Sequence, residues 1–424
     1  MKQNVLLLGS GGREHAMAVK IKESKLCGDL YIAPGNGGSE EVGINVNLSL
    51  SHFEQIGNFI LEKKISLVVV GPEGPLVEGI VDYFQQEPFR EIRFIGPDSY
   101  AAQLEGSKSF AKKFMQKYNI PTAGYVEVSM DNLEEGITFL NQRKPPYVLK
   151  ADGLAGGKGV LILDDVEEAI DSLKKMLGGQ FGEASKKVVL EEFLDGIEFS
   201  AFVLTDGNFY TLLPQAKDYK RVGEGDEGLN TGGMGAVSPV SFINDVLMNK
   251  VIRNIIEPTI NGIKEEKMLY KGFVFFGLIV VNNEPFVIEY NCRMGDPETE
   301  VVLPRLDEDI VDLFLNLFNS LTNHSICKEK DEFATTVMLV SGGYPGSFEK
   351  NKTIKIPKDI PQKVKLFHAG TKNMNGVLVT DGGRVMAVTS MASTMREAVE
   401  QSVEVAQHID FEGKYFRKDI GFDL

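Results

Sequence analysis

The chain has 424 residues, of which 43% are hydrophobic and 25% are charged, and its formal net charge is −15 at pH 7. This length predicts about three domains, and the apolar share is sufficient for sizeable cores. Nucleic acids and anionic membranes bind basic surfaces, so the acidic balance argues against both as general partners. We therefore expect no nucleic-acid partner and no membrane partner.

Cysteine usage and the amino terminus bear on localisation. Three widely spaced cysteines, Cys27, Cys292 and Cys327, form neither a disulfide framework nor a metal-ligand pattern. The apolar run in MKQNVLLLGS is too short for a signal peptide. No later run approaches the ~20 apolar residues of a membrane-spanning helix. These features predict a cytoplasmic protein.

Residues 4–105 alternate short apolar runs with amphipathic stretches. The runs lie at 5–9, 30–35, 67–71 and 92–96, and most end in glycine. Continuous apolar strands that alternate with helices are typical of a parallel sheet covered on both faces. Ligands of such sheets bind at the carboxyl ends of the strands. We predict an amino-terminal doubly wound parallel sheet over residues 1–104.

A glycine-rich turn, GSGG at 9–12, separates the first predicted strand from a helix. A dinucleotide fingerprint would place glycine where Glu14 stands and an acid where residues 33–35 read Ala-Pro-Gly, so the turn does not favour NAD. Amides at a helix amino terminus attract anions, and Arg13 adds a donor suited to phosphate. The alternative is a tight turn with a surface arginine.

A helix is predicted at 107–118, followed by a small α+β module that includes YVLKADGLAGGKGV at 147–160. The glycine loop in this stretch resembles the phosphate-binding loop G-x-x-x-x-G-K-[ST]. However, Asp152 stands where the first glycine belongs, and Gly159 stands where a Ser or Thr belongs. The loop is therefore either a phosphate site of another kind or a hinge.

Residues 199–325 predict two strands, a polar loop at 216–236, a helix near 244–264 and a hairpin. Loops of this length are usually functional or disordered, which favours substrate contact by Asp218, Lys220 and Arg221. The remaining residues, 333–424, predict a compact carboxyl-terminal domain of strands and helices.

The second hairpin strand ends in EYNCR, and side chains alternate along a strand. Glu289 and Asn291 therefore point to one side, and Tyr290 and Cys292 point to the other. Magnesium typically takes one or two protein oxygens and completes its shell with water and phosphates, so the first pair is a candidate site. Arg293 could contact a transferring phosphoryl group. The alternative is a strand that simply ends in polar residues, with Glu289 paired to Arg293.

Two lysines are candidates for phosphate contact. Lys150 ends a predicted strand, and we expect its ammonium group to reach the glycine loop. Lys108 begins a predicted helix, where a cation is unfavourable, so a bound anion explains it better than helix stability does. A solvated lysine remains the alternative. Residues 191–200 could read an adenine edge and hold a ribose, or could form a plain linker strand.

Together these features resemble the ATP-grasp ligases, in which two α+β modules clamp ATP and magnesium. The order and spacing of short motifs across the chain are similar to those of the phosphoribosylamine–glycine ligase family. These motifs are GGREHA (11–16), APGNGG (33–38), VGPEGPLVEGIVD (70–82), QLEGSK (103–108), LKADGLAGGKGV (149–160), LEEFLDG (190–196), NTGGMGA (230–236), EYNCRMGDPET (289–299), GGYPG (342–346), HAGT (368–371) and RKDIGF (417–422). Departures are small: Gly156, Tyr219, Leu229 and Met294 stand where alanine, histidine, proline and phenylalanine are common.

The resemblance implies the ATP-dependent ligation of glycine to 5-phosphoribosylamine through glycyl phosphate, the second step of de novo purine synthesis. It also implies an ATP-grasp core at 105–326 that contains a lid module at 123–189, and a compact α+β domain at 327–424. We expect a monomer that stands alone rather than as part of a fused enzyme. Another ATP-grasp ligase and a non-catalytic nucleotide-binding regulator remain the alternatives.

The resemblance further implies roles for individual residues. Arg293 and Lys150 would be catalytic, and Glu289 and Asn291 would bind Mg²⁺ or Mn²⁺. ATP would contact Lys108, Lys150, Gly153, Gly156, Gly157, Lys158, Gly159, Glu191, Glu192, Phe193, Leu194 and Glu198. The other substrates would contact Gly11, Gly12, Arg13, Glu14, Asp218, Lys220, Arg221, Asn230, Thr231, Gly232, Arg293, Gly295 and Asp296.

Overall fold

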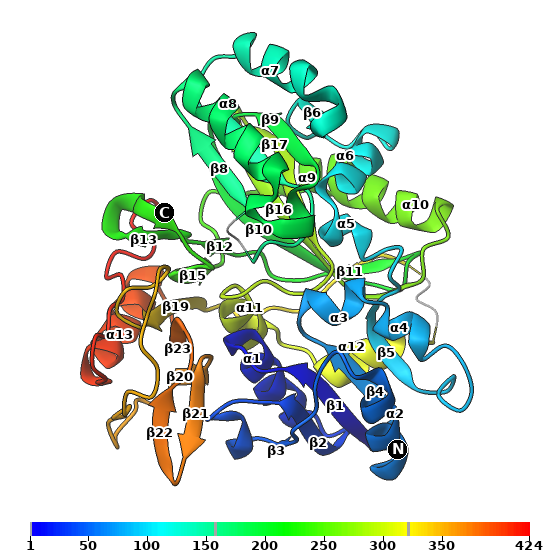
Figure 1. Cartoon of the computed structure of the whole chain (residues 1–424). Helices are drawn as coiled ribbons and strands as arrows, with labels where there is room; N and C mark the ends of the chain where they lie inside the picture. Colours follow the sequence, from blue (N-terminus) through cyan, green and yellow to red (C-terminus); the bar gives the residue numbers. More distant parts are fainter. Residues whose placement is uncertain (1, 157–158, 320–322) are drawn as a thin grey trace.

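The fold is described from a computed structural model, which covers residues 2–156, 159–319 and 323–424 (Figure 1). Its amino-terminal part is a parallel sheet in the order β3-β2-β1-β4-β5. The strands are β1 (Gln3–Gly9), β2 (Cys27–Pro34), β3 (Ile44–Asn45), β4 (Leu67–Val70) and β5 (Arg93–Pro97), and the helices are α1 (Gly12–Lys22), α2 (Phe53–Glu62), α3 (Glu73–Val77) and α4 (Ile80–Tyr83).

Alternate residues of β1 enter two different cores, which shows that helices cover both faces of this sheet. Leu6 and Leu8 pack in the same core as Ile56 of α2, whereas Val5 and Leu7 pack in the core that includes Met17 of α1. The predicted doubly wound sheet is therefore confirmed.

The parallel sheet continues into the centre of the molecule, because β5 pairs with the first residues of β16. β17 pairs with the rest of that edge, and β10 pairs with the other edge of β16. The strands of this half are β10 (Ile197–Thr205), β11 (Tyr210–Leu212), β16 (Tyr270–Val281), β17 (Glu284–Asn291) and β18 (Ser325–Ile326). Asn282 and Asn283 have positive φ angles of 52° and 63°, as a two-residue hairpin turn favours.

Short helices accompany this half of the sheet. They are α5 (Gln103–Gly106), α6 (Lys108–Lys117), α9 (Asp245–Val251), α10 (Glu257–Glu265), α11 (Thr299–Arg305) and α12 (Ile310–Asn316). A π-helical turn at Ile252–Ile256 joins α9 to α10, so the helix predicted near 244–264 is present in three consecutive pieces.

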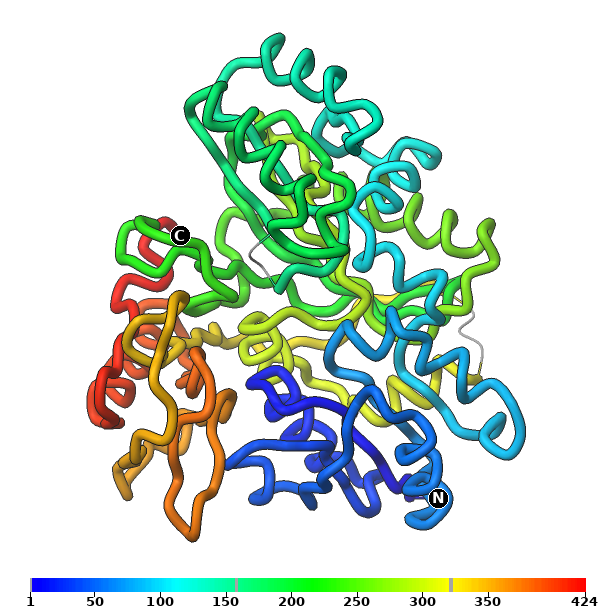
Figure 2. Tube along the Cα trace, viewed as in Figure 1, coloured from blue at the N-terminus to red at the C-terminus, as the bar shows by residue number. Residues whose placement is uncertain are grey.

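The lid module is an antiparallel sheet in the order β6-β9-β7-β8, with two helices. Its elements are β6 (Tyr125–Val128), α7 (Leu133–Asn141), β7 (Tyr147–Ala151), β8 (Val160–Leu163), α8 (Val166–Lys175) and β9 (Val188–Glu192). Tyr147, Leu149 and Ala151 pack with the helices in one core, so Val148 and Lys150 are left on the opposite face of β7. Figure 2 shows the module in the upper part of the view, where it overlaps the β16–β17 hairpin.

The carboxyl-terminal sheet has the order β12-β15-β19-β23-β20, and α13 packs against β19 and β23. Its elements are β12 (Lys217–Asp218), β15 (Gly235–Ser238), β19 (Phe333–Val340), β20 (Val364–His368), β23 (Arg384–Ala392) and α13 (Met395–His408); β21 (Thr371–Met374) and β22 (Val377–Thr380) form a separate hairpin. β12 and β15 therefore belong to this sheet, although they lie within the predicted core range. β15 pairs with β19 and so satisfies the backbone groups along that edge of β19.

The polar stretch at 216–236 is more ordered than a loop. Besides β12 and β15 it contains the hairpin of β13 (Arg221–Gly223) and β14 (Glu227–Asn230). The buried guanidinium of Arg417 ties this hairpin to the carboxyl terminus, since it donates to the Arg221 carbonyl and to Asp226.

No helix in the described part of the chain is both long and apolar enough to cross a membrane.

Candidate active site

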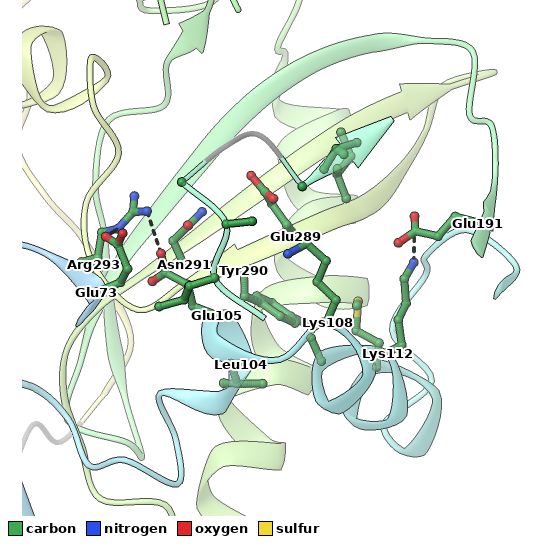
Figure 3. A pocket seen from close by; sticks show the side chains of 18 residues that line it. Glu73, Leu104, Glu105, Lys108, Lys112, Glu191, Glu289, Tyr290, Asn291 and Arg293 are labelled. Carbon is green, nitrogen blue, oxygen red and sulfur yellow. Dashed lines mark hydrogen bonds and ion pairs between the residues drawn. The ribbon is translucent and has the colours of Figure 1, made fainter. Parts of the chain in front are cut away.

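Two adjoining cavities, of about 500 Å³ and 180 Å³, lie where the lid module meets the β16–β17 hairpin. Both are lined by Glu73, Gly156, Val160, Glu191, Ile288, Glu289, Asn291 and Arg293. Figure 3 shows the smaller cavity, with side chains from the amino-terminal part, α6, the lid module and β17 around it.

Most of the predicted site residues line these cavities. The larger cavity is lined by Arg13, Lys150, Gly156, Glu191, Glu192, Phe193, Leu194, Glu198, Asp218, Lys220, Asn230, Thr231, Gly232, Glu289, Asn291, Arg293, Gly295 and Asp296, and the smaller cavity adds Lys108 and Gly159. The predicted nucleotide contacts Gly157 and Lys158 lie outside the described residues.

Five predicted residues do not belong to the described walls of either cavity: Gly11, Gly12, Glu14, Gly153 and Arg221. The first three belong to the first glycine turn, which is described below. The Gly153 amide donates to the carbonyl of Ala184 in the lid module. Arg221 donates to the Gly228 carbonyl across the β13–β14 hairpin.

The two predicted metal ligands lie on the cavity side of β17. Glu289 and Asn291 line both cavities (Figure 3). Cys292, which is 3% exposed, lines neither cavity, whereas Tyr290, which is 2% exposed, lines only the smaller one. No described residue forms a hydrogen bond or ion pair with the Glu289 carboxylate, and no group of three His, Cys, Asp or Glu side chains in the described chain could hold a metal ion. A free carboxylate beside an amide oxygen fits a hard cation that takes its remaining ligands from water and phosphate.

Arg293 pairs with two acids other than Glu289. Its guanidinium lies 3.2 Å from Glu73 Oε2 and 2.6 Å from Glu105 Oε1. The second Glu105 oxygen accepts a hydrogen bond from the Cys292 amide at 2.7 Å. Burial raises the pKa of Glu105 to about 7, although Arg293 opposes that rise. The alternative interpretation, a Glu289–Arg293 pair, is therefore wrong.

Lys150 makes a different contact from the one expected. Its ammonium group lies 2.9 Å from Glu191 Oε2 and 3.5 Å from the Ile288 carbonyl, and no contact with a described residue of the glycine loop is found. Lys112 of α6 also approaches Glu191 Oε2, at 3.2 Å. The other oxygen of Glu191 is buried and has no hydrogen-bond partner among the described residues. The Glu191 carboxylate of β9 thus connects Lys150 of β7 with Lys112 of α6 beneath the cavity.

Asp152, the residue that breaks the phosphate-loop pattern, adds to the cap of α6, whose N-cap residue is Ser107. Its carboxylate accepts hydrogen bonds from the Ser109 amide at 2.7 Å and the Ser107 hydroxyl at 3.0 Å. A negative charge is favourable at a helix amino terminus, so Asp152 offsets the unfavourable position of Lys108. Burial lowers the pKa of Lys108, and Glu289 opposes this. In Figure 3 the Lys108 ammonium points toward Glu289.

The first glycine turn is filled by Glu14. This carboxylate accepts from the Gly11 amide at 2.6 Å and pairs with Arg13 at 2.6 Å. A Cβ at Gly9, whose φ is +132°, would lie 2.3 Å from the Glu14 side chain. A Cβ at Gly12 would lie 2.4 Å from Glu300 Oε1. The turn is therefore occupied by the chain's own acids, and Arg13 alone of these residues reaches the cavity.

Arg13 is buried rather than on the surface, and it belongs to a meeting point of all three parts of the chain. It donates to the Met294 carbonyl at 3.1 Å. Arg384, from β23, donates to the carbonyls of Gly232 and Asp296, both at 2.7 Å. Arg384 also lies 3.0 Å from Asp296 Oδ1. Both arginines line the larger cavity.

Comparison with known proteins decides the family. Models of the phosphoribosylglycinamide synthetase N domain, ATP-grasp (A) domain and C domain match residues 3–105, 106–299 and 334–423. The chain belongs to the phosphoribosylglycinamide synthetase family.

Individual members of this family support the assignment. The chain is 41% identical over 424 residues to the phosphoribosylamine–glycine ligase of Haemophilus influenzae, covering 99% of this chain and 98% of that protein. The solved structure of the Thermotoga maritima phosphoribosylamine–glycine ligase is 36% identical, with a TM-score of 0.84 over 98% of this chain and 100% of that chain.

More distant structures share the fold. The biotin carboxylase domain of Hydrogenobacter thermophilus 2-oxoglutarate carboxylase, solved with MgADP and bicarbonate, has a TM-score of 0.72 at 16% identity, over 99% of this chain and 92% of that chain. The ATP-grasp family uses ATP and a divalent metal, and the fold prediction is confirmed.

Sequence reasoning missed several residues that line the cavities: Glu73, Glu105, Lys112 and Arg384. Glu73 and Glu105 lie within motifs that pointed to the family, so those motifs were the available signal. Lys112 follows Lys108 by one helical turn, which places both on one face of α6. Arg384 lies in no recognised motif and comes from the carboxyl-terminal part.

Proposed function

We propose that the chain ligates glycine to 5-phosphoribosylamine, with ATP converted to ADP and phosphate and with glycinamide ribonucleotide as the product. The observation that carries this proposal is the free Glu289 carboxylate beside Asn291. It faces a cavity that Lys108, Lys150 and Arg293 also line. All three parts of the chain match the family whose curated relatives are named for this activity.

In the first step, an oxygen of the glycine carboxylate attacks the γ-phosphorus of ATP, and the bond to the β–γ bridging oxygen breaks. Glycyl phosphate and ADP result. Such transfers depend mostly on positioning and charge neutralisation, which the two lysines and Arg293 supply. When bound at Glu289 and Asn291, Mg²⁺ or Mn²⁺ would neutralise phosphate charge.

In the second step, the phosphoribosylamine nitrogen attacks the acyl carbon, the carbon–oxygen bond to phosphate breaks, and the nitrogen loses a proton. Arg13 and the loop at 230–232 lie on the wall of the larger cavity, where the phosphorylated sugar would bind. Acyl phosphates hydrolyse readily, so the cavity must exclude water. The glycine loop at the edge of the lid module is suited to cover the phosphates.

The nucleotide is proposed to lie between the lid module and β17. Val148, Ile162 and Phe193 offer apolar surface there, and Glu192 offers a carboxylate for a ribose. A cytoplasmic monomer is also part of this proposal. Sedimentation velocity would measure the molecular mass, and a dimer at micromolar concentration would contradict the monomer.

The test is ADP release measured with each acceptor, with phosphoribosylamine generated in place from ribose 5-phosphate and ammonia. We expect release that requires both glycine and phosphoribosylamine. Equal turnover with bicarbonate or D-alanine would contradict the substrate assignment. Nucleotide binding without turnover of any acceptor would instead support a non-catalytic regulator.

A further inference from the structure

The sequence contains three Asn-Gly dipeptides, and the structure places each of them in a different environment. They are Asn36–Gly37, Asn261–Gly262 and Asn375–Gly376. Asn-Gly is the dipeptide most prone to lose ammonia, because glycine has no side chain to hinder attack by its amide nitrogen on the preceding carboxamide. The attack needs rotation about the asparagine backbone, so its rate depends on the contacts that hold each site.

Asn375–Gly376 forms the turn between β21 and β22, and few contacts hold it. Both residues are exposed and have positive φ angles, 54° and 82°, as a two-residue hairpin turn favours. Among the described residues, none forms a hydrogen bond with the Asn375 carboxamide or accepts one from the Gly376 amide. A Cβ added at Gly376 would meet no atom within 4 Å. Both reacting groups are therefore free, and the hairpin projects away from the lid module (Figure 1).

Asn36–Gly37 is the same dipeptide, but both of its reacting groups are held. Asn36 is 8% exposed, and its carboxamide nitrogen donates to the carbonyls of Ser10 and His368 at 2.9 Å and 2.7 Å. The Gly37 amide, which would be the attacking group, donates to the Thr371 carbonyl at 3.0 Å. Deamidation here would first break these hydrogen bonds, which join the amino-terminal part to the carboxyl-terminal part.

Asn261–Gly262 is held by a helix. Asn261 is exposed, as Asn375 is, but both residues of the dipeptide lie inside α10, where the Gly262 amide belongs to the helical hydrogen-bond ladder. Gly262 is also closely packed, since a Cβ there would lie 2.5 Å from the Phe114 ring. Attack at this site therefore requires the helix to open.

We propose that Asn375 is a site of spontaneous deamidation in the folded protein and that the fold protects Asn36 and Asn261. The Gly376 nitrogen attacks Cγ of Asn375, the Cγ–Nδ2 bond breaks, and the amide proton leaves with the departing nitrogen as ammonia. Water then opens the resulting succinimide at either ring carbonyl, which gives aspartate or isoaspartate. Water is the one co-reactant, and no oxidant or reductant takes part. This inference does not rest on the proposed function, since Asn375 lines neither cavity.

The test is peptide mapping by mass spectrometry after incubation of the folded, full-length protein in mildly alkaline ¹⁸O water. Each deamidation takes up a labelled oxygen from water, which distinguishes reaction during the incubation from earlier damage. We expect label at Asn375 to accumulate at least about tenfold faster than at Asn36 or Asn261, because hydrogen bonds must first open at those two sites.

The unfolded chain is the matched control. In denaturant the three asparagines should take up label at similar rates, because the dipeptides are identical and the fold no longer protects any of them. Asn375→Gln provides a second control in the folded protein. This variant keeps a carboxamide in the turn but would have to close a larger ring, so its label uptake at residue 375 should fall to the level of Asn36.

Two results would overturn the inference. Label at Asn36 or Asn261 that matches the label at Asn375 in the folded protein would show that hydrogen bonding and burial give no protection. A preference for Asn375 that persists unchanged in denaturant would show that flanking sequence, rather than the exposed turn, makes this residue reactive.

Discussion

Glu289 is a carboxylate on a cavity wall that no described residue pairs with, although Lys108, Lys150 and Arg293 line the same cavities. Arg293 and Lys150 are instead held by other acids: Arg293 by Glu73 and Glu105, and Lys150 by Glu191. Because other acids hold Arg293 and Lys150 in place, the Glu289 carboxylate stays available for a metal ion.

We expect Glu289→Gln to reduce turnover by on the order of a hundredfold or more, because a weaker metal ligand loses several kcal/mol of charge stabilisation. The substitution keeps the side-chain volume, so the melting temperature should stay close to that of the wild-type protein. ADP release and thermal unfolding measure the two effects. Wild-type turnover in a folded variant would reject the metal assignment.

Glu300 predicts a pH dependence of stability. It is fully buried, neither oxygen has a hydrogen-bond partner in the described chain, and burial and then Asp296 raise its pKa well above the ordinary value. The unfolded chain releases this proton near pH 4.5 and the folded chain retains it, so the cost to stability grows as the pH rises above that value.

Glu300→Gln removes this cost. The melting temperature of the variant relative to wild type should therefore increase between pH 5 and pH 8. Glu404→Gln, at an exposed position of α13, is the control and should show no such trend. A relative melting temperature that is flat or falls with pH would show that Glu300 ionises normally in the folded protein.

The side of β17 on which Glu289 and Asn291 lie could be predicted, because strand alternation is a local rule. The partner of Lys150 could not, since Glu191 is 41 residues away and adjoins it only through the pairing of β7 with β9. Arg293 was expected to act on a substrate anion, yet its acids Glu73 and Glu105 come from α3 and α5, which no short-range pattern connects to β17.

Among the helices, α6 has a cap that includes a residue distant in the sequence. Its first turn carries Lys108 and Ser109, and its cap includes the Asp152 carboxylate from the lid module. Sequence spacing predicted the helix but not this cap, because capping rules consider only neighbouring residues. The contact with α6 therefore explains why Asp152 stands where a phosphate-binding loop has glycine.

We expect Asp152→Ala to cost about 1 kcal/mol of stability, as loss of a helix cap does, and to raise the ATP KM because Lys108 begins the same helix. Asp165→Ala is the matched control. Asp165 caps α8 through the Glu168 amide at 2.9 Å and lines neither cavity. The control should lose similar stability with an unchanged ATP KM. An equal KM change in both variants would mean that general lid stability, rather than the α6 cap, controls ATP binding.

Across the whole chain, the amino-terminal and carboxyl-terminal parts meet at two buried histidines. His15 Nδ1 accepts a hydrogen bond from the His368 amide at 2.8 Å, and the rings lie 5.5 Å apart. Burial, and for His15 also the neighbouring His368, lowers their pKa values to about 3 and about 4. Both histidines are therefore neutral in the folded protein at pH 5.

This pair predicts acid sensitivity. Below about pH 6.5 the unfolded chain binds protons that the folded chain excludes, so stability falls as the pH falls toward about 4. In His15→Gln, the loss of melting temperature between pH 7 and pH 5 should be smaller than in wild type. His52→Gln, at an exposed position, should leave that loss unchanged. An unchanged or larger loss in His15→Gln would contradict the role of this interface.

The three-part organisation and the fold class were accessible from the sequence, because apolar runs and glycine turns recur in a recognisable order. The sharing of strands between parts was not. β12 and β15 lie within the predicted core range but pair in the carboxyl-terminal sheet, and β16 continues the amino-terminal sheet. Strands as short as β12 and β15 carry too little pattern to reveal their partners. The convergence of Arg13 and Arg384 near Asp296 follows from this sharing.

The central claim is that the cavity activates glycine through its carboxylate by phosphoryl transfer. The most direct measurement is mass spectrometry of the phosphate released when glycine labelled with ¹⁸O in its carboxylate is turned over with ATP and phosphoribosylamine. The account predicts one labelled oxygen in each phosphate, because the attacking carboxylate oxygen leaves with phosphorus. Phosphate free of the label during normal turnover would contradict it.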